Sequence, residues 1–278
     1  MPFTVNTFLS LALASIATAL PDYSHIDRDQ LILLDVKHDV TSDPTSALAS
    51  WDEKAYLCTF DHTTCTYDTA NERPLLIGLD LSHLHLSGPS SHPLGINFLP
   101  YLEDLTSFTA SENTFTGELA DIPLPSKLST IDISFNQLTG SIPDPAVWEL
   151  DSLQSLDLGY NRLSGNLPST IFAQKDLHLL FVPNNKLGGA IPEFAHTALR
   201  VVSLASCSFT GAIPKSIGKA KNLEEVYLNG NAGLNGKVPE ELCSLPKLRS
   251  ADLTKTGVNK SNLGPACQKA QKAGVLKL

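Results

Sequence analysis

Apolar and polar positions alternate in short stretches that return along most of the chain every 22 to 25 residues. Ile131 and Ile133 form one such pair, and Leu156 and Leu158 form the next. Alternation of this kind places both apolar side chains on one face of a short β-strand. Each pair is followed at a fixed offset by an Asn or a Cys, then by another apolar residue and a Gly; the marker residues are Asn113, Asn136, Asn161, Asn185, Cys207 and Asn231.

One such unit is too small to bury its own apolar face, so neighbouring units must stack into a solenoid with one strand per coil. The Asn lies where the chain bends, and we expect its amide to satisfy backbone groups that would otherwise cost on the order of 1–3 kcal/mol each. A weaker opening coil, with Leu84 in place of the Asn, and a closing coil, with Thr256, bring the expected total to about eight. A longer gap around residues 88–98 predicts a bulging loop.

The repeat follows the pattern L-x-x-L-x-L-x-x-N/C-x-L and often ends in Gly-x-Ile-Pro, as in LSTIDISFNQLTGSIP. It resembles the plant-type extracellular leucine-rich repeat, a subclass that includes polygalacturonase inhibitors and receptor-kinase ectodomains. The resemblance implies an α/β solenoid: a right-handed superhelix with a parallel, concave β-sheet and a cap at each end. We predict a signal peptide at 1–19, an N-terminal helical and disulfide cap at 20–74, the solenoid at 75–258 and a C-terminal cap at 259–278.

The cysteines fit such an exported, capped solenoid. The segment IDRDQLILLDVKHDVTSDPTSALASW resembles the N-terminal cap of the family, and Cys58 and Cys65 match its cysteine pair, although CTFDHTTC lacks the usual Trp, Gly and Val and so indicates a distant member. Five cysteines in an exported chain favour two disulfides and one free thiol. We expect the second bond to join Cys243 and Cys267 and Cys207 to stay free and inert.

The first residues predict export. The stretch FLSLALASIATA is apolar and ends in small residues, as in a cleavable secretory signal. No later segment has the ~20 apolar residues of a membrane span, so we expect a soluble, monomeric chain that is secreted to the extracellular space or the cell wall. Asn259, in Asn-Lys-Ser, is the one glycosylation acceptor motif in the sequence.

Charge limits the partners. The formal net charge is −9 and the isoelectric point is near 5.3, with no column of Lys or Arg along the repeats. This argues against nucleic acid as a partner. An acidic sheet face would attract a basic protein or cationic surface, although acidity also serves solubility.

Candidate binding residues lie in two exposed columns of the concave sheet, one between the buried pair of each coil and one further along each strand. In the middle coils these are conspicuously aromatic or acidic: Asp132, Phe135, Asp157, Tyr160, Phe181 and Tyr227. Exposed aromatic residues beside carboxylates suit either a sugar ring or a protein hot spot. The alternative is that aromatic pairs across strands only stabilise the sheet, by roughly 0.2–1 kcal/mol per pair.

Catalysis is not expected. Asp132 and Asp157 would lie about 5 Å apart at the backbone, a separation superficially similar to that of the two carboxylates of a retaining glycosidase. An open sheet face, however, lacks the cleft that raises the pKa of an acid and excludes water. The sequence has no catalytic, phosphate-loop or metal-ligand motif, and we expect no cofactor.

The sequence therefore predicts a secreted binding module, not an enzyme, that recognises an extracellular protein or a wall polysaccharide. The protein ligand could be a cell-wall-degrading enzyme or a receptor. The alternative is a structural protein that attaches to a wall or to ice through a regular surface. Ice binding would require ordered Thr, Ser and Asn columns, and Phe181, Val201 and Tyr227 interrupt them on the concave face.

Overall fold

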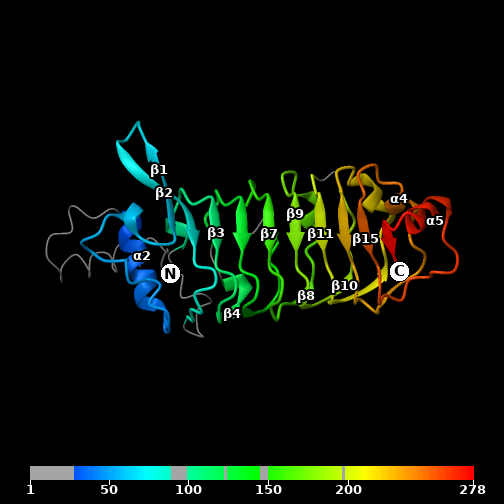
Figure 1. Cartoon of the computed structure of the whole chain (residues 1–278), viewed down its shortest axis with the longest axis horizontal. Helices are drawn as coiled ribbons and strands as arrows, with labels where there is room; N and C mark the ends of the chain where they lie inside the picture. Colours follow the sequence, from blue (N-terminus) through cyan, green and yellow to red (C-terminus); the bar gives the residue numbers. More distant parts are fainter. Residues whose placement is uncertain (1–27, 89–98, 122–123, 145–149, 196–197) are drawn as a thin grey trace, which may run out of the picture.

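The computed structural model describes residues 28–88, 99–121, 124–144, 150–195 and 198–278. The predicted signal peptide and most of the predicted bulging loop lie outside these residues. The described part is an elongated solenoid in which the strands of one sheet lie side by side along the long axis (Figure 1). The predicted α/β solenoid is thus confirmed, with eight coils stacked around one apolar core.

The main sheet has ten strands. Eight belong to the predicted coils and pair in parallel, each short except the first: β2 (Arg73–Asp80), β3 (Ser107–Thr109), β5 (Thr130–Asp132), β7 (Ser155–Asp157), β9 (Leu179–Phe181), β11 (Val201–Ser203), β13 (Glu225–Tyr227) and β15 (Ser250–Asp252). The sequence did not predict the two edge strands. β1 (Thr63–Asp68) pairs antiparallel with β2, and β16 (Leu276–Lys277) pairs in parallel with β15.

A second row of strands follows the marker residues. Four of them form one sheet, β8 (Ser164–Asn166), β10 (Lys186–Ala190), β12 (Ser208–Ala212) and β14 (Leu234–Asn235), and two form another, β4 (Thr116–Glu118) and β6 (Gln137–Thr139). Glycines in this row, such as Gly165 and Gly211, have φ values of +82° and +77°. Such angles are costly for other residues, which explains why Gly recurs at this point of the repeat.

Helices occupy little of the part of the chain that the structure describes. The segments that return from the second row to the main sheet are short 3₁₀ turns, η3 (Leu99–Tyr101), η4 (Leu119–Asp121), η5 (Ile171–Ala173) and η6 (Lys215–Lys219), or the four-residue helix α4 (Glu240–Cys243). The longer helices α2 (Arg28–Asp39) and α5 (Pro265–Lys272) lie at opposite ends of the solenoid (Figure 1). They cover the terminal coils, whose apolar side chains would otherwise face water.

The repeated Asn residues form a hydrogen-bonded ladder through the solenoid, as predicted. Asn161 is typical: its Oδ1 accepts the N–H of Leu138 at 3.0 Å, and its Nδ2 donates to the carbonyl oxygens of Ile133 at 3.0 Å and Leu158 at 3.2 Å. Because this residue is only 8% exposed, those backbone groups have little access to water. Each Asn therefore joins its own coil to the preceding one.

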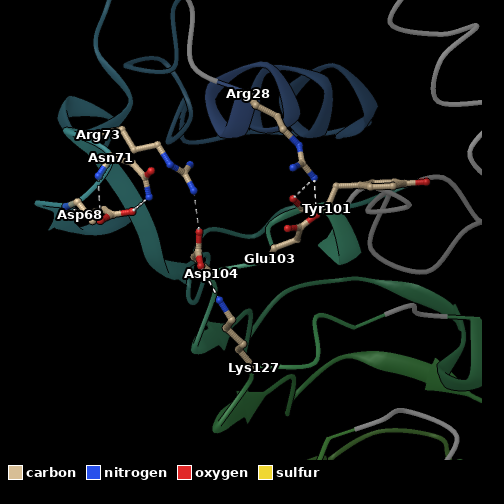
Figure 2. A network of polar contacts seen from close by, with 9 residues as sticks. Arg28, Asp68, Asn71, Arg73, Tyr101, Glu103, Asp104 and Lys127 are labelled. Carbon is tan, nitrogen blue, oxygen red and sulfur yellow. Dashed lines mark hydrogen bonds and ion pairs between the residues drawn. The ribbon is translucent and has the colours of Figure 1, made fainter.

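Polar contacts fasten the N-terminal cap to the first coils (Figure 2). The guanidinium of Arg28, in α2, donates to the carbonyl oxygen of Tyr101 at 2.9 Å and pairs with Glu103 at 3.1 Å. Asp104 forms two ion pairs: its Oδ2 lies 3.4 Å from the guanidinium of Arg73 in β2, and its Oδ1 lies 2.7 Å from Lys127 Nζ. These contacts cross three successive parts of the chain and hold the β1–β2 hairpin against the coil that follows.

Both predicted disulfides are present. Cys58 pairs with Cys65, which joins the turn η1 (Leu57–Thr59) to β1, and Cys243 pairs with Cys267, which joins α4 to α5. Cys207 is free, as predicted. Its thiol is half-buried, and burial raises the pKa of the Cys207 thiol. The sulfur donates to the carbonyl oxygens of Val182 and Ala205 at 3.3 and 3.6 Å, so it replaces Asn in part of the ladder.

Candidate functional site

We call the surface of the ten-stranded sheet that faces away from the core the open sheet face. On it, one residue from each coil strand stands in direct register with the next, and we call this series the register row. From β2 to β15 it consists of Asp80, Thr109, Asp132, Asp157, Phe181, Ser203, Tyr227 and Asp252. The strand register predicted from the sequence is therefore correct.

Phe135 and Tyr160 form an aromatic pair on the open sheet face. Their ring centroids are 4.0 Å apart and their planes differ by 9°. The two residues are nonetheless 46% and 47% exposed, among the most exposed large apolar side chains of the described residues. A stacked pair contributes about 0.5–1.5 kcal/mol beyond its buried area, yet half of this apolar surface still faces water.

The backbone conformation at Phe135 and Tyr160 is unfavourable for aromatic residues. Phe135 and Tyr160 have φ values of +51° and +54°, in the left-handed region, and the equivalent residues of other coils, such as Asn184 and Gly230, do too. Every coil requires this conformation at the turn, and bulky side chains adopt it at a cost of order 1 kcal/mol. Asn and Gly would meet the requirement more cheaply. The fold therefore does not explain why two aromatic residues occupy adjacent turns.

Asp132 and Asp157 lie side by side in the register row, three residues before the aromatic pair in their coils. Asp132 Oδ1 accepts the N–H of Ser134 at 3.0 Å and its hydroxyl at 2.6 Å. Asp157 Oδ1 accepts the N–H of Gly159 at 2.8 Å. Burial, together with the charge of Asp132, raises the pKa of Asp157 to about 6 despite the hydrogen bond from Gly159.

The other two predicted residues lie further along the row. Phe181 is half-buried and stands in register between Asp157 and Ser203. Tyr227 is separated from it by β11 and donates its hydroxyl to Glu225 Oε2 at 2.6 Å; this hydrogen bond, with burial, raises the pKa of Tyr227. Five of the six candidates are therefore contiguous, whereas Tyr227 stands apart.

The structure adds a feature that the sequence reading did not identify: a hollow of about 340 Å³ where β1, β2 and β3 meet. Hydroxyl groups, one carboxylate and two apolar side chains surround it; its lining residues are Thr64, Ile77, Gly78, Leu79, Asp80, Thr106, Ser107 and Thr109. Gly78 lets Thr64 of β1 pack closely against β2 at this hollow, because a Cβ on residue 78 would lie 3.0 Å from the Cβ of Thr64. The sequence contains one indication of this hollow: Gly78 occupies a strand position at which the other coils have larger side chains.

Asp80 is ionised in this hollow. Its Oδ1 accepts the hydroxyl of Thr109 at 2.6 Å and the N–H of Ser82 at 3.0 Å. Burial alone would raise the pKa of Asp80, but these hydrogen bonds, with His62 nearby, outweigh it and lower that pKa. Asp80 therefore keeps its negative charge at lower pH than Asp157 does.

Comparison with known proteins identifies the same repeat. Residues 127–146, 152–173 and 198–220 match the Leucine Rich Repeat family model. Together with the fold, these matches show that the chain is a leucine-rich-repeat protein. Pollen receptor-like kinase 1 of Arabidopsis thaliana is 30% identical over 237 residues, which cover 85% of this chain and 34% of that relative.

Solved structures place the chain more narrowly, beside plant receptor ectodomains. The ectodomain of the Arabidopsis receptor kinase HAESA, in complex with an N-terminally extended IDA peptide hormone, is 29% identical with a TM-score of 0.73, covering 84% of this chain and 38% of that one. A plant ice-binding protein is 21% identical with a TM-score of 0.57, covering 86% and 90%. The second likeness shows the fold alone.

The chain spans about a third of the length of the receptor-like kinases that it matches. Within the described segments, none of the helices has the length and apolar character needed to cross a bilayer.

Proposed function

We propose that this protein is an extracellular binding module, without catalytic activity, that captures a peptide or protein on its open sheet face. The observation that carries the proposal is the Phe135–Tyr160 pair, which is stacked, half-exposed and placed at two turns where aromatic residues cost folding energy. A ligand that covers the rings would recover the burial that folding leaves incomplete.

The comparisons support a peptide or protein ligand. A structural neighbour at 29% identity holds a peptide hormone, and the relatives are receptor-like proteins. The two disulfides support an oxidising, extracellular location. A cell-wall-degrading enzyme, a receptor and a wall polysaccharide are the finer alternatives, and the test below separates them.

The test is capture by the purified chain from extracellular proteins and, separately, on insoluble wall polysaccharides. A triple variant, Phe135→Ala, Tyr160→Ala and Phe181→Ala, is run beside it. We expect a protein or peptide that the native chain retains and the variant loses at least tenfold. Tyr56→Ala is the matched control, because Tyr56 is 83% exposed and lies outside the sheet.

Each result decides between alternatives. Loss of the partner in the triple variant with unchanged unfolding temperature supports the proposal. Retention on polysaccharide alone would make the chain a wall-binding module. Equal capture by native chain and triple variant would overturn the proposed site.

A second candidate function is attachment to a regular surface such as ice, through the second sheet. Its exposed residues from β8 to β14 are small and mostly uncharged: Ser164, Gly165, Asn166, Ala190, Ser208, Thr210, Ala212 and Asn235, interrupted by Lys186. An ice-recrystallisation assay tests this. Inhibition that Thr210→Lys abolishes and the aromatic triple variant preserves would favour it over peptide capture.

A further inference from the structure

The N-terminal half of the register row carries three carboxylates in line. Asp80, Asp132 and Asp157 stand on β2, β5 and β7, with Thr109 of β3 between the first two. Neighbouring strands are about 4.8 Å apart, so Asp132 lies roughly 10 Å and Asp157 roughly 14 Å from Asp80 along the row. The C-terminal end of the row differs, because Lys277 stands in register beside Asp252.

These carboxylates are held but not neutralised. Each accepts hydrogen bonds on its Oδ1 atom. The donors are Ser82 and Thr109 for Asp80, Ser134 for Asp132 and Gly159 for Asp157. Among the described residues, no Lys, Arg or His nitrogen forms an ion pair within 4.0 Å of any of the three, although the Ser82 side chain and the charge of His62 also act on Asp80. The row therefore presents fixed negative charge outward.

Two features restrict what can bind this charge. The hollow beside Asp80 has a volume of about 340 Å³, and hydroxyl groups, the Asp80 carboxylate and the apolar residues Ile77 and Leu79 line it, so it has room for the head group of a long side chain and part of its aliphatic stem. Asp132 and Asp157 stand in the coils that carry the Phe135–Tyr160 pair, whose rings can pack against an aliphatic stem or a guanidinium plane. Both features fit Lys or Arg better than an uncharged sugar.

We propose that the open sheet face receives an extended segment of another protein that carries two basic side chains four residues apart. One basic side chain enters the hollow beside Asp80, and the other sits between Asp132 and Asp157 against the aromatic pair. An extended chain rises about 3.3 Å per residue and repeats its facing every second residue, so residues i and i+4 point the same way about 13 Å apart. The distance from Asp80 to the midpoint of Asp132 and Asp157 is roughly 12 Å.

This inference rests on the proposed function and specifies its ligand. It also makes binding depend on pH at one end of the segment. Asp157 faces Asp132 of β5 on one side and Phe181 of β9 on the other, with the Gly159 N–H in its own coil. Because its pKa is about 6, acidification through that value removes one of the two negative charges at the second basic side chain. Asp80 keeps its charge over the same range.

The experiment measures binding of capped twelve-residue peptides, made of Ser and Pro with two Arg at separations of one, two, four or eight, to the purified full chain. At pH 7 we expect the separation of four to bind at least about fivefold more tightly than one or eight. A matched peptide with two Glu should not bind. From pH 7 to pH 5 the affinity of the best peptide should fall about threefold or more.

Three single variants assign the charges. Asp80→Asn should weaken binding about three- to tenfold and leave the fall with acid intact. Asp157→Asn should weaken it at pH 7 and remove the fall between pH 7 and pH 5. Asp252→Asn is the control, because Asp252 lies in the same row and accepts from Thr254 the same pair of hydrogen bonds that Asp132 accepts from Ser134. This variant should bind the peptide as tightly as the native chain at both pH values.

Equal binding at every Arg separation, an equal loss in Asp252→Asn, or no binding of dibasic peptides would overturn this inference. The proposed binding function is tested by a different comparison of variants. If a captured partner is lost in the Phe135, Tyr160 and Phe181 variant but kept in Asp80→Asn and Asp157→Asn, the face binds a ligand that is not dibasic. If the aromatic variant also keeps its partner, the binding site itself is elsewhere.

Discussion

Asp157 lies beside Asp132 in the register of two neighbouring parallel strands, so two carboxyl groups share one part of the open sheet face. Burial raises the pKa of Asp157 to about 6, and the neighbouring carboxylate adds to the rise. The same pair that suits a cationic ligand is therefore unfavourable in the free protein. This conflict between stability and binding can be measured.

We predict that Asp157→Asn stabilises the free protein at pH 7.5. The unfolded state releases this proton near pH 4, whereas the folded state holds it until about pH 6, so stability falls as the pH rises between those values and the cost persists above them. Two pKa units correspond to roughly 3 kcal/mol, which partial exposure reduces to about 1–2 kcal/mol. Urea unfolding at pH 7.5 and pH 4 tests this. The gain should vanish at pH 4, and a variant less stable than the native chain at pH 7.5 would contradict it.

Cys207 provides a second prediction, because it interrupts the Asn ladder. In the adjacent coil Asn231 Oδ1 accepts the N–H of Phe209 at 3.0 Å, and the equivalent N–H of Leu187 meets a sulfur. Sulfur is a weak acceptor, so Cys207→Asn should raise the free energy of unfolding by about 1 kcal/mol. Cys207→Ala is the control and should lower it, because it removes the thiol without replacing its hydrogen bonds.

Equilibrium unfolding in urea measures both variants. A Cys207→Asn protein less stable than the native chain would show that the larger amide does not fit this coil. In the native protein, a thiol reagent should modify Cys207 slowly before unfolding, because the thiol is half-buried and burial raises its pKa.

The repeat explains how much of the fold was predictable. The eight coil strands, the Asn ladder and the exposed row follow from a fixed period, since each coil repeats the same alternation and the same bend. Both disulfides followed from the resemblance and from the position of the cysteines at the two ends. The two edge strands were not predicted, because neither belongs to the repeat: β1 has no counterpart in the coils, and β16 consists of two residues after α5.

The candidate site was predictable only in part, for a related reason. Register placed Asp132 beside Asp157 and Phe135 beside Tyr160, because equivalent residues of adjacent coils must be neighbours. The hollow beside Asp80 depends on β1, an edge strand that pairs antiparallel with β2 and that no periodic pattern encodes. The left-handed conformation of the two aromatic residues was equally hidden, because the Phe and Tyr that occupy it rarely adopt it.

The two disulfides should contribute unequally. The Cys243–Cys267 bond closes a loop with a sequence separation of 24, against 7 for Cys58–Cys65. On the chain-entropy model these loops correspond to about 3.5 and 2.4 kcal/mol. We predict that Cys243→Ser with Cys267→Ser destabilises the C-terminal end more than Cys58→Ser with Cys65→Ser destabilises the N-terminal cap. Hydrogen exchange of α5 and of β1 reports each end separately, and a larger loss of protection in β1 would contradict the prediction.

The aromatic pair yields the prediction that most directly separates folding from binding. Phe135→Asn places in this turn the residue type that Asn184 provides two coils later. Relief of the left-handed strain, of order 1 kcal/mol, should offset the lost stacking of about 0.5–1.5 kcal/mol, so the free energy of unfolding should change by less than about 1 kcal/mol. Capture of a ligand by the open sheet face should nevertheless fall at least tenfold, because Tyr160 alone presents a smaller apolar surface. Urea unfolding and capture are measured on the same preparation, with Ser206→Asn as the control at an equivalent turn. A destabilisation of 2 kcal/mol or more with unchanged capture would show that the pair serves the fold instead of a ligand.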